Sequence, residues 1–383
     1  MNEKIYLDHA ATTPIRPEVI DVMTDVMKHN FGNPSSIHSF GRKAHKQLTE
    51  MRKIIANSLS VKEHEIIFNS GGTESDNTAI ISTALFRKDL GKHIITTAIE
   101  HHAVLHSMEY LEKNFGFEVT YLPVDEHGNL NIEDFNKSLR EDTILVSIMY
   151  GNNEIGNLMP IKEIGELLEN HPAYFHTDAV QAYGLVDIRP HELGIDLLSV
   201  SAHKLNGPKG VGFLYKNDAI LLPEFMHGGE QEEKRRAGTE NLIGITGMGK
   251  AVELLTDDEK HARAAHYANY QAIILDSLEK AEIEYHINGD VKNKLPHVLN
   301  LYLPGVNSDL LLMSMDLKGI ALSTGSACTA GTVDPSHVLI ALYGENHPAI
   351  KESIRISFGY GNTEEAITTF TGELVTAIQR LKK

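Results

Sequence analysis

The chain has 383 residues, of which 42% are hydrophobic and 23% are charged, close to the average for globular proteins. Its 35 Lys and Arg against 52 Asp and Glu give a formal net charge of −17, so the surface as a whole repels phosphate backbones. Length, composition and charge exclude a small disulfide-rich scaffold, a membrane-spanning helix and general nucleic-acid binding.

The N-terminal sequence MNEKIYLDHAATTP lacks the basic and apolar regions of a secretory signal, so we expect a cytoplasmic protein with no membrane association. Cys328 is the only cysteine, which excludes an intramolecular disulfide and a metal site built from several thiolates. Any thiol chemistry of this chain must therefore use Cys328.

Short apolar or β-branched runs alternate with helical patterns along the first two thirds of the chain. We expect strands over 65–70, 92–98, 117–123, 143–151, 173–179, 196–202 and 210–216, with helices over 73–88, 101–115 and 161–171. This alternation is typical of parallel strands joined by helices that cover both faces of the sheet. We therefore predict an α/β fold with a large, mostly parallel sheet domain over residues 14–255.

The pattern changes after about residue 255. Thr256 and Glu259 have the spacing of a capping box before a long helix, and strand-like segments follow at 297–303 and 353–359. An apolar stripe predicts a last helix, and it consists of Ile367, Phe370, Leu374, Ile378 and Leu381. We predict a smaller α+β domain, formed by residues 1–13 and 256–383, that packs closely against the large one.

The sequence SGGTES at 70–75 separates a predicted strand from a predicted helix. Glycines such as Gly72 let the backbone approach a ligand, and N–H groups at the start of a helix attract an anion, so this turn is a candidate phosphate site. Thr73 and Asp76 also fit an ordinary capping box, and that alternative stays open. The turn is neither a Walker loop nor a GxGxxG fingerprint, which argues against ATP and NAD.

Two charged residues follow predicted strands. Lys204 precedes a tight Gly/Pro turn, where a desolvated lysine can form a Schiff base, although a surface lysine that extends into solvent is the common alternative. Ser201 and His203 belong to the same turn and could reach a phosphate. Asp178 could pair with a protonated ring nitrogen or cap a helix, and Gln181 could face the same pocket.

Histidines follow the strand predicted at 92–98. His102 and His106 are four residues apart and could share a metal ion, but the glutamate of HExxH is missing and no cysteine is near in sequence. We therefore predict no metal site. His101 is the better candidate for function, because an imidazole at a strand end can stack on a flat cofactor.

Cys328 lies in a run of small and hydroxyl residues at 322–331 that fits neither an amphipathic helix nor an alternating strand. A lone cysteine is commonly a small core residue, but an exposed loop is the simplest account of this run. A thiol on an exposed loop is a nucleophile, so we expect Cys328 to be functional.

Together, these segments resemble the cysteine desulfurases of the NifS/IscS type, which belong to the class-V aminotransferase-like group of fold-type I pyridoxal phosphate enzymes. The resemblance covers essentially the whole chain, and its further motifs are YLDHAATTP (6–14), GNPSSIH (32–38), GNNEIG (151–156), RAGTEN (236–241) and SIRISFG (353–359). It implies a homodimer that converts L-cysteine to L-alanine and leaves the sulfur on Cys328 as a persulfide. A sulfur-acceptor protein of iron–sulfur cluster assembly or of tRNA thiolation would then receive the sulfur.

The resemblance also implies a role for each candidate residue. Lys204 would form the Schiff base with pyridoxal phosphate and remove the Cα proton, Asp178 would pair with the ring nitrogen, and His101 would stack on the ring. Asn153 and Gln181 would contact the 3-hydroxyl region. The phosphate would be held by Gly72, Thr73, Ser201, His203 and, from the neighbouring subunit, Thr239. The substrate carboxylate would bind Arg355, with Asn33 and Asn153 nearby.

Other functions remain open at this point. An enzyme of the same fold could be a selenocysteine lyase or a general β-eliminating lyase. A catalytically silent binding protein would be expected to lack Lys204 or Cys328, and both are present. A phosphate-binding protein without pyridoxal phosphate is the third alternative.

Overall fold

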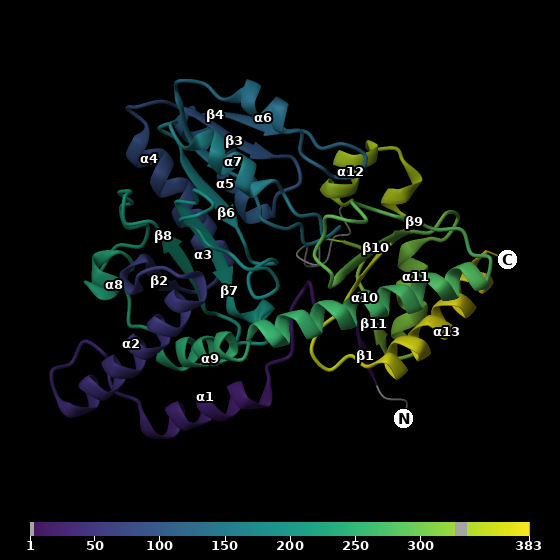
Figure 1. Cartoon of the computed structure of the whole chain (residues 1–383), viewed down its shortest axis with the longest axis horizontal. Coiled ribbons are helices and arrows are strands. Elements are labelled where there is room, and N and C mark those ends of the chain that lie inside the picture. Colours follow the sequence, from purple (N-terminus) through teal and green to yellow (C-terminus); the bar gives the residue numbers. More distant parts are fainter. Residues whose placement is uncertain (1–3, 326–334, 383) are drawn as a thin grey trace.

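The structure is a computed structural model that describes residues 4–325 and 335–382. Figure 1 shows a large sheet with helices packed around it and, beside it, a smaller unit that contains both chain ends. In the described residues the large sheet has seven strands in the order β2-β8-β7-β6-β5-β3-β4. The strands are β2 (Ile66–Asn69), β3 (His93–Thr97), β4 (Glu118–Leu122), β5 (Thr143–Ser147), β6 (Tyr174–Asp178), β7 (Leu197–Ser201) and β8 (Gly212–Lys216).

Strand direction confirms the predicted α/β class. The pairs β3–β4, β3–β5, β5–β6 and β6–β7 are all parallel, whereas β8 runs antiparallel to both of its neighbours, β7 and β2. The central strands β3, β5 and β7 are buried along their whole length, because helices cover both faces of the sheet. The carboxyl ends of the parallel strands consequently share one edge of the sheet.

The helices of the large unit are α1 (Pro17–His29), α2 (Ser39–Leu59), α3 (Gly72–Asn77), α4 (Thr83–Arg87), α5 (His102–Phe115), α6 (Ile132–Ser138), α7 (Ile161–Leu168), α8 (Gln231–Lys234) and α9 (Leu242–Glu253). Helix α5 illustrates how the local sequence sets its bounds. His101 Nδ1 accepts a hydrogen bond from the Ala103 N–H at the start of the helix, and Gly116 ends it with a φ of 66°. A left-handed residue at that position favours glycine.

The helix predicted over 73–88 is present, but it has three parts. Helix α3 continues through a π-helical turn, η2 (Thr78–Ser82), into α4. The capping-box alternative for Thr73 is wrong, because the helix begins one residue earlier and Gly71 precedes it without a side-chain cap. Gly71 has a φ of 143°, a conformation that L side chains rarely adopt.

Helix α9 packs between α1 and α2 in the large unit. Its close approach depends on two glycines. A Cβ atom on Gly247 would lie 2.7 Å from Met23 Sδ, and one on Gly249 would lie 2.4 Å from Met51 Sδ. The sequence GMG therefore lets a helix that is buried on most sides contact two neighbouring helices directly.

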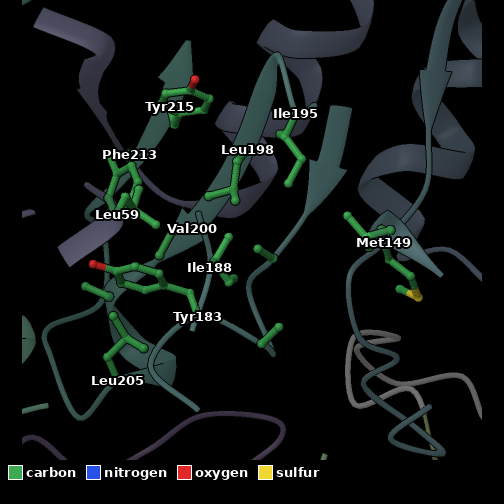
Figure 2. Packing of buried hydrophobic residues seen from close by; sticks show 14 of the residues in the cluster. Leu59, Met149, Tyr183, Ile188, Ile195, Leu198, Val200, Leu205, Phe213 and Tyr215 are labelled. Carbon is green, nitrogen blue, oxygen red and sulfur yellow. The ribbon is translucent and has the colours of Figure 1, made fainter. Parts of the chain in front are cut away.

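Buried side chains from β7, β8 and the following loops form the centre of the larger core (Figure 2). Tyr183 packs edge-on against Phe213, with ring centroids 5.5 Å apart, and its hydroxyl lies 2.5 Å from Ser58 Oγ. A buried tyrosine hydroxyl needs such a partner. This core supports the strand ends at which the predicted site residues lie.

The smaller unit contains an antiparallel sheet of β9 (His286–Ile287), β10 (Val298–Tyr302) and β12 (Ser353–Ser357), and a parallel pair of β1 (Ile5–Tyr6) and β11 (Ile320–Ala321). Its helices include α10 (Asp257–Lys280), α11 (Ser308–Asp316) and α13 (Glu364–Leu381). The capping prediction is confirmed, since the Thr256 side chain accepts a hydrogen bond from the Glu259 N–H. Phe370 and Leu374 on α13 are fully buried in the core of this unit.

Helix α12 (His337–Tyr343) belongs to the C-terminal part of the chain but packs elsewhere. Its Val338, Leu339 and Leu342 join the core of the large unit. The domain boundaries of 14–255 for the large domain and of 1–13 with 256–383 for the small one stay predictions. Among the described residues, no helix is long and apolar enough to cross a bilayer.

Replacing Phe370 with alanine should test the smaller core. Phe370→Ala empties a fully buried site, so we expect the free energy of unfolding to fall by about 3–5 kcal/mol. Thr369→Ala changes an exposed neighbour on the same helix and should stay within about 0.5 kcal/mol of the wild type. Urea unfolding followed by circular dichroism measures both values, and equal losses in the two variants would contradict this account of the core.

Candidate active site

A pocket of about 430 Å³ opens at the edge of the sheet where the parallel strands end. It is bordered by residues 10–12 and by the turns that follow β2, β3, β5, β6 and β7. Most of the predicted site residues line it, namely Gly72, Thr73, His101, Asn153, Asp178, Gln181, Ser201, His203, Lys204 and Arg355. Their predicted roles are not tested by this placement.

Lys204 is the last residue of the short 3-10 turn η3 (Ala202–Lys204) that follows β7. Its Nζ donates a hydrogen bond to the carbonyl oxygen of Ala10 and another, of 2.8 Å, to that of Ala11. The two carbonyls orient the amine at the pocket wall without supplying a counter-charge. No sequence pattern indicates that Ala10 and Ala11 contribute, because only their backbone takes part.

Asp178 ends β6 and is almost fully buried. Burial raises its pKa from 3.8 to about 6, while the Val180 N–H and the charge of Lys204 act in the opposite direction. The Val180 N–H donates to Asp178 Oδ1 at 2.9 Å, but no helix begins there, so the helix-cap alternative is wrong. Asp178 is therefore a carboxylate at neutral pH that can accept a hydrogen bond from a cationic partner in the pocket.

A second buried carboxyl group lies behind the pocket, and the sequence reading missed its role. Asp76 on α3 is 1% exposed, and burial together with the charge of Asp178 raises its pKa well above the usual value. His176 Nε2 lies 3.6 Å from Asp76 Oδ1. Burial lowers the pKa of His176 to about 3, so this imidazole is neutral at physiological pH and brings no positive charge to Asp76.

His101 caps helix α5 at the mouth of β3. Burial, and after it the charge of Lys204, lowers its pKa from 6.5 to about 4. The imidazole is therefore neutral near pH 7, and a neutral ring suits contact with a flat aromatic ligand. His102 and His106 stack on each other with centroids 5.1 Å apart, but in the part of the chain that the structure describes no third ligand atom joins them at metal-binding spacing.

The far wall of the pocket carries groups suited to a phosphate. Gly71 approaches Ser201 so closely that a Cβ on the glycine would lie 3.3 Å from Ser201 Oγ. Burial and then the charge of Lys204 lower the pKa of His203 to about 4, and its Nδ1 lies 3.2 Å from Thr12 Oγ1. The hydroxyls of Thr12 and Ser201, the imidazole of His203 and the amine of Lys209 thus all line the pocket and can donate hydrogen bonds to an anion.

These walls fit pyridoxal phosphate. The ring requires a lysine for its aldehyde carbon and a carboxylate for its nitrogen, and Lys204 and Asp178 border the same pocket. The phosphate requires donors and little steric bulk, which Ser201, His203 and the glycine pair at 71–72 supply.

Arg355 extends into the pocket from β12 of the smaller unit and is 1% exposed. Its Nη2 donates to Asp8 Oδ1 at 2.8 Å and its Nη1 donates to the Asn153 carbonyl at 3.0 Å. Its Nε is buried and has no hydrogen-bond partner among the described residues. The guanidinium is thus held in place by Asp8, a residue that the sequence reading missed, with donor capacity left for a carboxylate ligand.

Gln181 has both ends of its amide engaged. Its Nε2 donates to the Ala10 carbonyl at 3.0 Å, and its Oε1 lies 3.1 Å from His297 Nε2. Gln181 therefore forms a fixed part of the pocket wall, and its contact with a ligand stays a prediction.

Two predicted residues that the structure describes do not line this pocket, namely Asn33 and Thr239. Asn33 is exposed between α1 and α2, where its side chain accepts a hydrogen bond from the Ser35 N–H, and Figure 1 shows the connection between these helices at the end of the large unit that faces away from the smaller unit. The proximity of Asn33 to Arg355 therefore stays a prediction, which the pocket lining of this single chain does not support. Thr239 lines a separate surface hollow beside Ser70. Cys328 lies outside the described residues.

The basic run Lys234-Arg235-Arg236, which precedes Thr239, is engaged within its own chain. Arg236 forms a two-pronged ion pair with Glu74, at 2.8 and 3.2 Å, and Arg235 donates to the Glu232 carbonyl. The buried Glu232 is paired with Arg52 at 2.6 Å. This run consequently fastens the loop after α8 to the large unit.

Comparisons with known proteins agree with this geometry. The pattern of the class-V aminotransferase family matches residues 5–370. A Bacillus subtilis (strain 168) protein that carries the name IscS 1 is 54% identical over 379 residues, which cover 99% of this chain and 100% of the relative. The cysteine desulfurase IscS of Clostridium botulinum (strain Hall) is 46% identical over 369 residues, or 96% and 92% of the two chains. A solved NifS-like protein superposes with a TM-score of 0.92 at 33% identity and covers 99% of this chain and 100% of its own.

The buried His176 should make stability depend on pH. Its folded pKa of about 3 is below the ordinary 6.5, so the unfolded chain binds a proton below pH 6.5 that the folded chain does not. Stability should therefore fall on acidification, by up to about 1.4 kcal/mol per pH unit for this one group. Urea unfolding at several pH values between about 7 and 5 measures how the free energy of unfolding changes with pH. In His176→Gln this free energy should fall less steeply on acidification than in the wild type and in the control Thr369→Ala. Equal slopes in all three proteins would contradict the shift.

Proposed function

The chain belongs to the class-V aminotransferase family and is a pyridoxal phosphate-dependent cysteine desulfurase of the NifS/IscS type, and from this premise we propose how its own residues carry out the reaction. The observation that supports the assignment is that Lys204, Asp178 and Arg355 line one pocket at the strand ends. They supply a nucleophilic amine, a carboxylate and a carboxylate-binding cation within reach of a single small substrate.

We assign the cofactor contacts to residues of the pocket walls. Gly72, Thr73, Ser201 and His203 hold the phosphate, and Asn153 and Gln181 face the 3-hydroxyl region. His101 lies against the ring. Bound pyridoxal phosphate supplies an electron sink for bond breaking at the substrate Cα. Asp178, ionised at neutral pH, accepts a hydrogen bond from a protonated ring nitrogen and so stabilises the cationic ring.

Arg355 and Lys204 act on the substrate. The Arg355 guanidinium, oriented by Asp8 and by the Asn153 carbonyl, binds the carboxylate of L-cysteine. The Lys204 amine is the general base that removes the Cα proton. The carbonyls of Ala10 and Ala11 hold Nζ beside the pocket, and neither competes for the proton at neutral pH.

Cys328 accepts the sulfur. Its thiolate attacks the sulfur of the bound cysteine, and the new S–S bond forms as the Cβ–S bond breaks. The electron pair of the broken bond stays with carbon, which gains a proton, so the products are alanine and a persulfide on Cys328. An acceptor protein of iron–sulfur cluster assembly or of tRNA thiolation then receives the sulfur. The cytoplasmic location stays a prediction.

We also propose a homodimer with composite sites. Thr239 is exposed and does not line the catalytic pocket, but it lines a neighbouring hollow that shares Ser70 and Gly210 with that pocket. Its side chain would serve the phosphate of the neighbouring subunit. The basic run at 234–236 is not an argument for the dimer, because Arg235 and Arg236 are engaged within the chain.

Two variants should separate the amine chemistry from the thiol chemistry. Cys328→Ala should bind pyridoxal phosphate and cysteine with unchanged visible absorbance but release no alanine, because only the sulfur acceptor is missing. Lys204→Ala should fail earlier, at Cα deprotonation, so it should not exchange the Cα hydrogen of cysteine for deuterium from solvent. Wild-type protein given cysteine without an acceptor should gain one sulfur atom in its intact mass, reversibly with a reducing thiol. Release of sulfide by Cys328→Ala at the wild-type rate would instead indicate a β-eliminating lyase.

Mixed dimers should test the origin of Thr239. Thr239→Ala removes one hydrogen bond to an anion, which should lower the affinity for pyridoxal phosphate by roughly tenfold. When this variant is co-expressed with Lys204→Ala, a composite arrangement creates one site with both residues intact. Activity at limiting cofactor should then exceed that of either variant alone. If native mass spectrometry shows the mixed dimer without any gain in activity, Thr239 does not serve the other subunit.

A further inference from the structure

One buried carboxylate lies between the two ends of the segment that carries Cys328. Glu154 has no exposed surface and belongs to the turn that follows β5. Its backbone is held on both sides, since its N–H donates to Asn152 Oδ1 at 2.8 Å and its carbonyl accepts from Asn300 Nδ2 at 3.0 Å. The side chain therefore starts from a rigid part of the pocket rim, one residue after Asn153.

The C-terminal end of the segment is attached to this carboxylate through Ser336. Ser336 is buried and precedes helix α12, and its hydroxyl donates to Glu154 Oε2 at 2.5 Å and accepts from the Leu339 N–H at 3.1 Å. The next residue, His337, bonds through Nε2 to the Glu100 carbonyl at 2.8 Å. The start of α12 is thus joined to the turns after β3 and β5, which line the pocket.

The N-terminal end approaches the same oxygen. A Cβ on Gly325 would lie 2.8 Å from Glu154 Oε2 and 3.5 Å from Ser336 Cβ, so only glycine fits there without displacement, and its φ is 154°. Two residues earlier, Ser323 pairs with Arg355 through N–H to carbonyl bonds of 2.7 and 3.3 Å. This end is therefore attached to the strand that carries the carboxylate-binding arginine.

We propose that Glu154 is a positioning residue that holds Gly325 and Ser336, and with them the two ends of the segment that carries Cys328, next to each other. Gly325 and Ser336 are eleven positions apart in the sequence, yet both meet one carboxylate oxygen. In general, fixing both ends of a chain segment reduces the number of conformations open to it, and a reacting group that is restricted in this way acts as if its concentration were higher. The role in sulfur transfer rests on the proposed function of Cys328, but the attachment of the two ends does not.

The attachment joins both units of the molecule. The N-terminal end is bonded to β12 of the smaller unit, whereas α12 packs Val338 and Leu339 into the core of the large unit. Glu154 contacts the chain at both of these attachments, through Gly325 on one side and Ser336 on the other.

The single cysteine gives a readout that is independent of turnover. In the holoenzyme without cysteine, the rate at which iodoacetamide alkylates Cys328 can be followed by intact mass. Glu154→Ala removes the acceptor and Ser336→Ala removes the donor, so each should raise this rate by roughly fivefold, the effect of losing one ordinary hydrogen bond. Glu154→Gln keeps an oxygen for Ser336 and should stay close to the wild-type rate. Ser308→Ala, at another buried serine that begins a helix, is the matched control and should change nothing.

A second measurement links the attachment to catalysis. In Glu154→Ala and Ser336→Ala, exchange of the substrate Cα hydrogen with solvent should continue at the wild-type rate, because Lys204 performs it. The gain of one sulfur atom by Cys328 should be slower by a similar factor of about five. The proposal would be overturned if Glu154→Ala and Ser336→Ala were alkylated no faster than the wild type. It would also be overturned if Glu154→Gln were alkylated as fast as these two variants. A wild-type protein that never gains sulfur on Cys328 would refute the proposed function instead and leave the alkylation result to decide on the attachment.

Discussion

The path of residues 8–13 is the constraint on which the pocket depends. This segment leaves β1 in the smaller unit and crosses the pocket to reach the large unit. Along it, Asp8 orients Arg355, and two consecutive carbonyls accept hydrogen bonds from Lys204. Residues 9–11 form a turn in which the Ala11 and Thr12 N–H groups donate to the Asp8 carbonyl, so the segment has a fixed shape and can hold Arg355 and Lys204 at a set separation. The substrate-binding cation and the catalytic amine are therefore located by the same piece of chain.

The electrostatics of the pocket follow from burial. His101 and His203 line it and are neutral, because burial disfavours the charged imidazolium and the nearby charge of Lys204 disfavours it further. Lys204, Lys209 and Arg355 are the cations that the described residues place there. In a protein with a net charge of −17, the pocket thus offers three cationic side chains to an anionic cofactor and an anionic substrate carboxylate, beside the carboxyl groups of Glu74, Asp76 and Asp178.

The sequence could predict residues whose function depends on their place at a strand end. Lys204, Asp178 and His101 were found because parallel strands share one edge, so residues that follow them meet there. Asp8 was not found, since its partner is 347 positions away and no local pattern links the two. The contribution of Ala10 was equally hidden, because it is made by the backbone and does not depend on residue type. The place of Asn33 was hidden for a related reason, since a motif does not reveal how two long helices position the connection between them.

The pairing of the first strand with distant partners also bears on biosynthesis. Strand β1 pairs with β11, and Asp8 bonds to Arg355, so the N-terminal segment emerges from the ribosome long before its partners exist. The strands of the large sheet, by contrast, are complete once residue 216 has been made. Domains generally fold as units in the order of synthesis, and contacts between distant residues form slowly. We therefore expect the nascent chain to complete its cofactor-binding sheet first and its substrate-binding arginine last, which leaves a period in translation when the protein can hold the phosphate but not yet the amino acid.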